Sequence, residues 1–373
     1  MFQKATFIER LNRFTVVCQI NGQKTQAYLP NPGRLWEILI PGKTVYLKKQ
    51  EKGLPFILWA AERQGQIMCL DTQYTNEVAK TLIASGAIED LEGYLIKGRE
   101  YKINGHRIDF LLTNGLRDLI LEVKSCTLFH DGIAMFPDAV TLRGRKHLEI
   151  LAKRNGAIVF IVQNPQVRYF LPDFHTDPDF SQTLSKFRDN ILIKPVSIRW
   201  KEDMTFEFVD ELFIPWYIYD SESSDKGSYM VCGRLGDEKT LQVGKLGMLT
   251  FKPGYYVYVG SAMNSLSARI KRHRRVRKSL KWHIGHIAPH FKDFIAVPVR
   301  SSEPLECSLS KAVGSIADDY VSNFGCSDCN CDSHLYWFAE NPFKSEKFVD
   351  IILDFRIGRF KKLLKPDDCV GIS

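Results

Sequence analysis

The sequence predicts a multidomain protein of mixed α/β and α+β class. Two observations carry the first half of this prediction. An opening stretch has many short apolar runs separated by Gly and Pro turns, and the next stretch alternates strand-like with helix-like segments. A polar, Ser-rich segment then precedes a region with aromatic strands and a dense basic helix. At 373 residues, the chain is long enough for two or three such domains.

Residues 1–70 predict a small β-barrel of the OB type. Their apolar runs read FTVVCQI, QAYLP, TVYLKK, FILWA and QIMCL, and the turns between them read NG, NPG, PGK and KGLP. Short runs bounded by Gly and Pro are typical of strands, and the WEIL segment among them has a helical character. Barrels of this type commonly bind nucleic-acid strands.

Residues 71–216 predict an α/β core. EVAKTLIASG has helical spacing and ends at Gly86, a residue type that favours helix C-termini. HRIDFLL and DLILEVKS are strand-like, AVTLRGRKHLEILAKR is helix-like with a basic face, and AIVFIVQ resembles a buried strand. This alternation predicts a largely buried sheet flanked by helices.

The remaining chain divides into three segments. Segment 217–226 is polar, Ser-rich and acidic, and it predicts a linker. Residues 227–340 are expected to form a compact α+β domain. Residues 341–373 are expected to form a basic, helical C-terminal extension.

The composition argues against several classes of protein. Hydrophobic residues make up 45% of the chain and charged residues 25%, which is typical of a folded domain. The N-terminus lacks the apolar core of a signal peptide, and the apolar run 157–162 is too short to span a bilayer. Nine cysteines, mostly single and in apolar surroundings, fit reduced thiols better than a disulfide framework. We therefore expect a cytoplasmic protein without a membrane partner.

Basic residues are concentrated in one block. The formal net charge is only +8, but residues 269–281 read RIKRHRRVRKSLK. Such a block suits a polyanionic partner, because each neutralised phosphate releases condensed counterions. A solvated basic face without a partner is the alternative interpretation. The candidate phosphate contacts of this block are Lys271, Arg272, Arg274 and Arg275.

A first group of candidate catalytic residues comprises Asp109, Glu122 and Lys124. Asp109 ends one candidate strand, and the other two lie on the next strand with their side chains on the same face. Two carboxylates on adjacent strands suit a hard divalent cation such as Mg²⁺. A neighbouring lysine can orient or deprotonate a water for attack on phosphorus. A salt bridge on an edge strand is the alternative interpretation.

Further basic residues surround this group. The downstream run FPDAVTLRGRKHLEIL places basic side chains near a helix start, where phosphate contacts are geometrically easy. An ordinary solvated helix face is the alternative interpretation. The candidate nucleic-acid contacts here are Arg143, Arg145, Lys146 and His147, together with Arg34 in the NPGR turn.

The strings LPNPGRLWEILIPGKTVYL, HRIDFLL, EVKSCTL, FPDAVTLRGRKHLEIL and FIVQ resemble the sugar fermentation stimulation protein A family. They follow one another across residues 1–215. The resemblance implies an OB-like domain, a PD-(D/E)xK nuclease-like domain and DNA binding. It also implies that Asp109 and Glu122 are metal ligands and that Lys124 is the catalytic lysine. Nucleases of this superfamily often use one more acidic residue, for which Glu77 and Glu100 both remain candidates.

A second group of candidate catalytic residues follows the linker. Tyr229 and Tyr258 lie on glycine-flanked strands, and Arg269 and His273 share a helix face at a spacing of four residues. Glu306 begins another helix-like stretch. In phosphodiester hydrolysis, a tyrosinate or a tyrosine-oriented water attacks, the cations neutralise phosphate charge and the carboxylate holds a metal.

These residues, in this order, resemble the GIY-YIG nuclease superfamily over about residues 227–338. The strings GYYVYVGSA, WHIGH and SDCNCDSHLYWF are similar to a subgroup of small domains within it. The resemblance implies that Tyr229 and Tyr258 are the paired tyrosines. It further implies Arg269 and His273 on phosphate and Glu306 on Mg²⁺. Ser228 stands where the name motif has isoleucine.

A cysteine-rich segment follows. Its side chains are of the types that bind Zn²⁺, although the spacing is not that of a standard zinc finger. Reduced thiols that pack the end of the domain are the alternative interpretation. The candidate zinc ligands are Cys326, Cys329, Cys331 and His334.

Two functions follow from these patterns. The first is a nuclease that depends on Mg²⁺ or Mn²⁺ and acts on nucleic acid, with DNA favoured over RNA. The second is a DNA-binding transcriptional regulator that retains nuclease folds without turnover. Bound divalent metal would discriminate between them, because a pure binding module has no need of a carboxylate-held cation.

Overall fold

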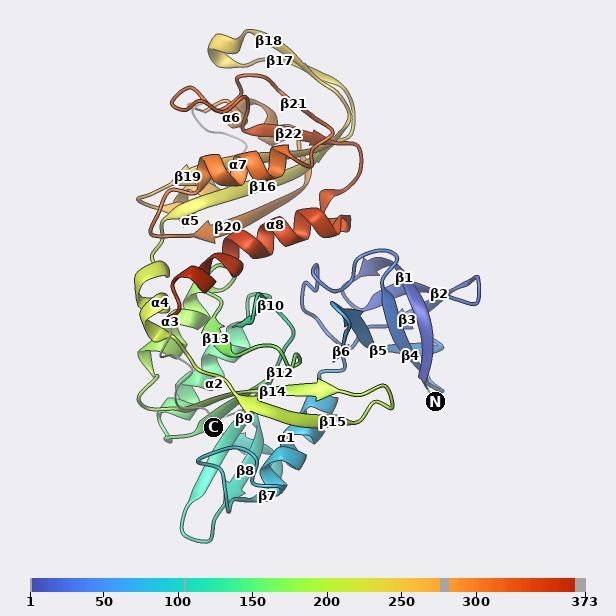
Figure 1. Cartoon of the computed structure of the whole chain (residues 1–373), viewed down its shortest axis with the longest axis vertical. Helices are drawn as coiled ribbons and strands as arrows, with labels where there is room; N and C mark the ends of the chain where they lie inside the picture. Colours follow the sequence, from blue (N-terminus) through green and yellow to red (C-terminus); the bar gives the residue numbers. More distant parts are fainter. Residues whose placement is uncertain (1, 104, 276–281, 366–373) are drawn as a thin grey trace. The chain divides into compact units, whose positions relative to one another are not determined.

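The computed structural model describes residues 2–103, 105–275 and 282–365, which form two compact units (Figure 1). The first unit runs up to Trp216 and takes in the chain again from Phe360, and the second comprises Tyr217–Arg359. Among the helices in these described ranges, none combines the length and apolar character that a bilayer crossing requires.

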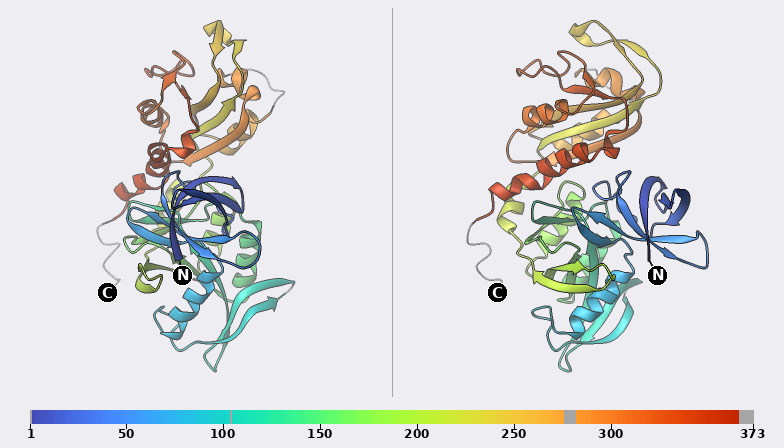
Figure 2. Two further views of the ribbon diagram at one scale, coloured as in Figure 1. Left: turned by 90° about the vertical axis from the view of Figure 1, so that its right-hand side faces the viewer. Right: turned by 45° about the vertical axis from the view of Figure 1, so that its right-hand side comes forward.

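The first unit begins with a β-barrel, which can be followed in Figure 2. Its strands follow the order β3-β2-β1-β4-β5-β6. The barrel closes because Ala27 and Tyr28 of β3 pair in parallel with Phe56 and Ile57 of β5. The strands are β1 (Phe2–Asn12), β2 (Thr15–Ile20), β3 (Gln23–Tyr28), β4 (Thr44–Lys49), β5 (Phe56–Arg63) and β6 (Gln66–Cys69). The predicted barrel is confirmed, but β1 is absent from the sequence prediction because charged residues interrupt its apolar alternation.

A six-stranded mixed sheet forms the α/β core, in the order β15-β14-β12-β9-β8-β7. Its strands are β7 (Leu95–Ile103), β8 (His106–Thr113), β9 (Asp118–Cys126), β12 (Ala157–Val162), β14 (Leu192–Trp200) and β15 (Phe206–Glu211). All six residues of β12 are buried, and the strand runs parallel to both β9 and β14. An apolar strand with two parallel neighbours is typical of a sheet covered on both faces.

Helices cover the two faces of this sheet. Val159 of β12 packs in one cluster with Val78 and Leu82 of α1 (Tyr74–Ala84). Phe160 packs in another cluster, which includes Leu148 of α2 (Leu142–Ala152) and residues of α3 (Pro178–Lys186). Neighbouring residues of a strand point to opposite faces, so one strand supplies both cores.

Two capped helix starts lie close together in the first unit. Thr141 accepts a hydrogen bond from Gly144 N at the start of α2, and Asp177 accepts one from Phe180 N at the start of α3. Asp177 also accepts a bond from the backbone N–H of Thr141, so the two caps are joined. Beside them lies a small sheet of β10 (Phe129–His130), β11 (Ile133–Phe136) and β13 (Tyr169–Pro172).

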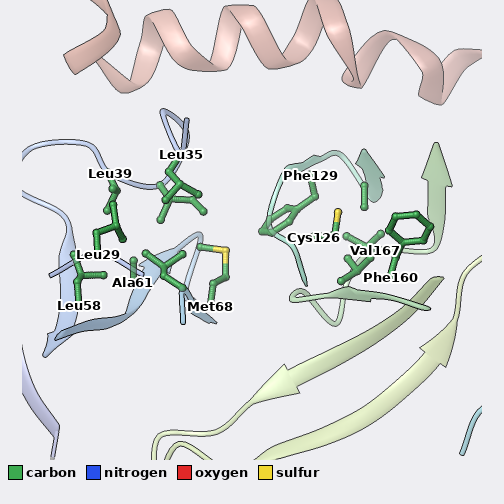
Figure 3. Packing of buried hydrophobic residues seen from close by; sticks show 14 of the residues in the cluster. Leu29, Leu35, Leu39, Leu58, Ala61, Met68, Cys126, Phe129, Phe160 and Val167 are labelled. Atoms are coloured by element: carbon green, nitrogen blue, oxygen red, sulfur yellow. The ribbon is translucent and has the colours of Figure 1, made fainter. Parts of the chain in front are cut away.

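The barrel and the α/β core share one hydrophobic cluster, part of which Figure 3 shows, with Leu58 and Met68 from the barrel and Phe129 and Phe160 from the core. One buried amide reinforces this junction. Gln163 Oε1 accepts hydrogen bonds from Cys69 N at 2.6 Å and from Trp200 Nε1 at 2.9 Å.

The second unit is built on a five-stranded sheet in the order β20-β16-β19-β22-β21. Its strands are β16 (Gly227–Leu235), β19 (Gly254–Ala262), β20 (Lys292–Arg300), β21 (Asp319–Tyr320) and β22 (Leu335–Phe338), with β17 (Lys239–Gln242) and β18 (Met248–Phe251) as a separate hairpin. Its helices are α5 (Leu266–His273), α6 (Ile284–Ile287), α7 (Glu306–Gly314) and α8 (Glu346–Arg356). Short 3₁₀ turns span Gly244–Leu246, Ala288–His290, Pro342–Lys344 and Gly358–Lys362.

Two segments pack more closely into the second unit than the sequence predicts. The predicted linker 217–226 lies largely in helix α4 (Trp216–Glu222), where Ile218 is buried and Glu222 forms an ion pair with Arg359 at 2.7 Å. The predicted C-terminal extension contains α8, which contacts α7 and β20 and buries Phe348. Both segments therefore contribute to the packing of the second unit.

The chain re-enters the first unit at Phe360, whose side chain is fully buried. Its ring lies 5.8 Å from that of Phe174 and is stacked on His175 at 6.1 Å.

Replacing Gln163 with Ala is expected to destabilise the first unit. Two buried N–H donors would lose their acceptor, which costs on the order of 1–3 kcal/mol for each donor. Calorimetry of the full chain should show a lower melting temperature for the first unit, and hydrogen exchange at the Cys69 amide should accelerate. Gln166→Ala is the matched control, because the Gln166 side chain is exposed. Equal melting temperatures for both variants would contradict the proposed role of the amide.

Candidate functional site

A cavity of about 400 Å³ opens in the first unit beside β9. It is lined by residues from the barrel loops, α1, β8, β9, the segment before α2 and the first turn of α2. Those that carry polar side chains are Arg13, Asn31, Thr72, Asn76, Asp109, Glu122, Lys124, Ser125, Thr127, Asp138, Thr141 and Arg143. Gly33 also lines it, and a Cβ at this position would lie 2.1 Å from Asp138 Oδ2. Only glycine allows this close approach of the barrel loop.

The predicted group Asp109, Glu122 and Lys124 comes together in this cavity. Strands β8 and β9 pair antiparallel with Phe110 opposite Leu121, so the adjacent Asp109 and Glu122 are neighbours. Asp109 Oδ2 accepts a hydrogen bond from Val123 N at 2.8 Å. Lys124 Nζ forms an ion pair with Glu122 Oε1.

Glu122 is a buried carboxylate with only 2% of its surface exposed. His147 Nδ1 lies 2.6 Å from Oε1 of Glu122, and the histidine is itself 1% exposed. Among the described residues, Oε2 of Glu122 has no hydrogen-bond partner. A buried acceptor of this kind is unusual, and an ion beside it is one of the explanations.

The electrostatics of the carboxylate pair are asymmetric. Burial and the charge of Glu122 raise the pKa of Asp109. Burial also acts to raise the pKa of Glu122, but Lys124 and His147 outweigh it and the net shift is downward. One of these two close carboxylates resists ionisation. A bound cation would stabilise the ionised form of both carboxylates.

Neither candidate for the additional acidic residue lies in the cavity. Glu77 is on α1 and forms an ion pair with Arg99, while Glu100 is exposed on β7 and pairs with Arg107. The expectation of one of them at the site is therefore wrong. Helix α1 instead contributes Asn76, whose Nδ2 donates to Asp109 Oδ1 at 3.1 Å. Nothing in the sequence indicated Asn76, because the motif calls for an acidic residue and Asn76 is a neutral amide beside the candidate Glu77.

The predicted basic contacts occupy different places. Arg143 lines the cavity, and its Nε lies 3.3 Å from His147 Nε2. Arg145 forms an ion pair with Asp179, and Lys146 is exposed in a shallow basic groove with Lys153.

The structure corrects the prediction for His147, while the contact of Arg34 with nucleic acid stays a prediction. His147 was predicted to contact nucleic acid, but its buried ring faces Glu122, so this prediction is wrong. Arg34 is half-buried, with its guanidinium over the ring of Trp36.

A second cavity, of about 460 Å³, lies in the second unit. Four of the five predicted catalytic residues of this unit line it. The lining comprises Tyr229, Tyr258, Ser261, Arg269, Trp282, His283, Glu306, Gly325, Ser327 and Asp328. Trp282 and His283 belong to the WHIGH string of the resemblance, whereas sequence reasoning missed Ser261 of β19 and the loop residue Asp328, because isolated Ser and Asp residues are too common to stand out.

Tyr229 and Tyr258 lie on the neighbouring strands β16 and β19, with ring centroids 6.3 Å apart. Tyr229 Oη lies 2.7 Å from His273 Nε2. A Cβ at Gly260 would lie 2.6 Å from Tyr229 Oη, so glycine makes room for this phenol. His273 is buried and holds Tyr229, so the predicted direct contact of His273 with phosphate is wrong.

Burial raises the pKa of both tyrosines. At Tyr229, Arg269 opposes the increase, while at Tyr258 the neighbouring Tyr229 and Glu306 add to it. Both phenols are therefore neutral at physiological pH. Of the two roles considered for them, this favours orienting a water over attack by a tyrosinate.

Glu306 stands at the start of α7 and is fixed from two sides. Ser261 Oγ donates to Oε2, and His334 Nδ1 lies 3.1 Å from Oε1. Arg269 is close by, since its Nη1 donates to the carbonyl of Ser261 at 3.3 Å. The guanidinium of Arg269 also lies 4.0 Å from the ring centre of Trp282, which orients it by a cation–π contact.

The described part of the basic block ends at Arg275. Lys271, Arg274 and Arg275 are exposed, while Arg272 is half-buried and lies over Trp282 at 4.8 Å. The rest of the block, residues 276–281, lies outside the described residues.

The cysteine-rich segment forms a group that differs from the prediction by one residue. Within the described chain, Cys329, Cys331 and His334 gather with Cys307 of α7, and their ligand atoms all lie within 4.8 Å of one another. The predicted ligand Cys326 is outside this group, so its assignment is wrong. Cys307 was missed because it is distant in sequence and stands alone.

Comparisons with known proteins agree with this organisation. Residues 8–70 match the SfsA N-terminal OB domain, and residues 73–204 match the Sugar fermentation stimulation protein RE domain. Residues 228–356 match the Domain of unknown function DUF123.

Individual relatives cover the first part of the chain. A sugar fermentation stimulation protein homolog of Caldanaerobacter subterraneus subsp. tengcongensis is 41% identical over 189 residues, 48% of this chain and 82% of the relative. One of Methanothermobacter thermautotrophicus is 36% identical over 191 residues, 49% of this chain and 80% of the relative.

A solved structure is also similar. Pyrococcus furiosus SfsA in complex with Ca²⁺ has a TM-score of 0.54 and 26% identity, covering 57% of this chain and 96% of that one. The shared sequence, the two matched domains and the fold lead to one conclusion: this chain belongs to the sugar fermentation stimulation protein family, and it continues into a domain of unknown function DUF123.

Proposed function

We propose that this protein is a metal-dependent nuclease that hydrolyses phosphodiester bonds of nucleic acid, with DNA favoured over RNA. The observation that carries the proposal is the cavity in which Asp109, Glu122 and Lys124 converge. Structural salt bridges do not require a second carboxylate, yet the half-buried Asp109 stands beside the Glu122–Lys124 pair.

The donor set of this cavity fits a hard divalent cation. Asp109 and Glu122 would hold it through carboxylate oxygens, which Mg²⁺ and Mn²⁺ prefer. Oε2 of Glu122, which has no hydrogen-bond partner in the described part of the chain, can supply a lone pair without breaking a hydrogen bond. The related Pyrococcus furiosus protein was solved with Ca²⁺, another cation that takes oxygen ligands. When bound, the cation would supply Lewis-acid stabilisation of charge on the phosphate.

The protein's own groups have distinct roles in this proposal. Lys124, with 21% of its side chain exposed, can orient a water from the cavity side while it pairs with Glu122. Arg143 lines the same cavity and can contact a phosphate oxygen. His147 acts as a positioning residue, because it fixes the carboxylate of Glu122.

The second unit supports a further nuclease site of the GIY-YIG type. Tyr229, held by His273, can orient a water, and Arg269, held over Trp282, can neutralise phosphate charge. Glu306 presents its carboxylate to the cavity and would hold Mg²⁺ or Mn²⁺. Exposed Lys271, with its basic neighbours, would attract the nucleic-acid backbone.

Cleavage assays with labelled DNA and RNA test this proposal. In Mg²⁺ or Mn²⁺, Glu122→Ala or Glu306→Ala should lower the cleavage that the respective site contributes by about 10²-fold or more, since charge stabilisation at the phosphate is lost. EDTA should abolish cleavage, and the double variant should show none. Exposed Glu202→Ala and Glu340→Ala serve as controls for the two units.

The pattern of loss assigns the chemistry. Loss with only one of the two substitutions would make the other cavity a binding module. A native protein that binds DNA but never cuts it with either metal, and whose variants bind equally well, would instead establish the DNA-binding regulator without turnover.

Metal affinity tests the role of His147 separately. In a Glu306→Ala background, His147→Ala should weaken Mn²⁺ binding at the first cavity by about 10–100-fold, as expected when the support of a ligand is removed. Titration calorimetry measures this, and His147→Gln should recover part of the affinity by restoring a donor. Lys146→Ala is the control, because that side chain is exposed on the same helix. Unchanged affinity in a folded His147→Ala protein would refute the positioning role.

A further inference from the structure

Three thiols and one imidazole gather in the second unit although the sequence separates them. Cys307 is the second residue of α7, Cys329 and Cys331 lie in the loop that precedes β22, and His334 directly precedes that strand. In the described part of the chain, the ligand atoms of these four side chains all lie within 4.8 Å of one another. We propose that Cys307, Cys329, Cys331 and His334 form a structural Zn²⁺ site.

The chemistry of the four ligands selects the class of metal. Thiolates are soft ligands that suit Zn²⁺ and do not suit Mg²⁺ or Ca²⁺. A set of three cysteines and one histidine fills all four positions of a tetrahedral ion, which is typical of structural rather than catalytic zinc. Binding of the ion would release the thiol protons to solvent and form three Zn–S bonds and one Zn–N bond.

The distances are close to those of a loaded site. A tetrahedral ion with Zn–S of about 2.3 Å and Zn–N of about 2.0 Å separates its sulfur and nitrogen ligands by about 3.5 Å. Cys329 Sγ and His334 Nε2 are 3.5 Å apart. Sulfur ligands of such an ion lie about 3.8 Å apart, so closure of the 4.8 Å group requires movements on the order of 1 Å.

His334 already has the orientation that a ligand needs. Its Nε2 faces Cys329, while its Nδ1 faces the carboxylate of Glu306 at 3.1 Å. A carboxylate on the far nitrogen is the usual support of a zinc-bound histidine, because it fixes the tautomer and the ring. The backbone is also fixed, since His334 N donates to Phe324 O at 2.8 Å and His334 O accepts from Val259 N at 2.9 Å.

The site would join the loop of Cys329 and Cys331 to the start of α7. Glu306 directly precedes Cys307, and its carboxylate also contacts His334. The ion would therefore fix the positions of Cys307 and His334, the two residues next to this carboxylate. The inference does not rest on the proposed nuclease activity, because metal content is measured without substrate.

Metal analysis of the full chain tests the site. Protein purified from a zinc-supplemented culture should contain about one Zn²⁺ per chain, measured by inductively coupled plasma mass spectrometry. Cys307→Ser should lose most of this zinc, and Cys326→Ser should retain it. Cys326 is the matched control because it lies in the same loop region, three residues before Cys329, and outside the group. Replacement by Co²⁺ should give the visible bands of a tetrahedral ion and the near-ultraviolet absorption of cobalt–thiolate bonds.

A chemical measurement on the unsubstituted protein covers the case in which Cys307→Ser does not fold. Bound zinc should protect Cys307, Cys329 and Cys331 from alkylation, and a chelator should expose all three together. The inference is overturned by protein without zinc and without cobalt–thiolate absorption. It is equally overturned by zinc that is lost with Cys326→Ser but kept with Cys307→Ser, or by a disulfide between two of the three thiols in the purified protein.

Discussion

The first unit depends on the complete burial of β12. A strand with six buried residues and a parallel neighbour on each edge cannot leave either face of its sheet in water. Helix α1 covers one face, and α2 covers the other. Because α2 is pressed against the sheet, its His147 reaches Glu122 on the adjacent strand. The same packing that stabilises the sheet thus removes water from a carboxylate, which must then find its partners within the protein.

The sequence predicted those features that repeat at short range. Alternating apolar runs and glycine turns identified the barrel, and the apolar run 157–162 identified the buried strand. The prediction missed β1 and expected an irregular linker where α4 lies. In both places polar residues hide a short-range pattern, because burial of residues such as Ile218 depends on contacts with distant parts of the chain.

The predictions of site residues also succeeded where they depended on short-range patterns and failed where they depended on distant contacts. Asp109, Glu122 and Lys124 were predicted correctly as a group because strand pairing brings neighbours in sequence together. The assignments of Glu77 or Glu100, of His147 as a surface contact and of Cys326 failed. Each depended on the direction of a side chain or on a partner remote in sequence, as with Asn76 and Cys307. A spacing pattern specifies which residues share a face, but it does not specify what faces them across the core.

The burial of Phe360 against Phe174 and His175 has a consequence for how the protein is made. In the language of domain architecture, the second unit is an insertion, since the first unit takes up the chain both before and after it. Domains generally fold in order as the chain leaves the ribosome. Here the first unit receives the Phe360 side chain only after all of residues 217–359 have been synthesised, so its maturation is coupled to the synthesis of the second unit.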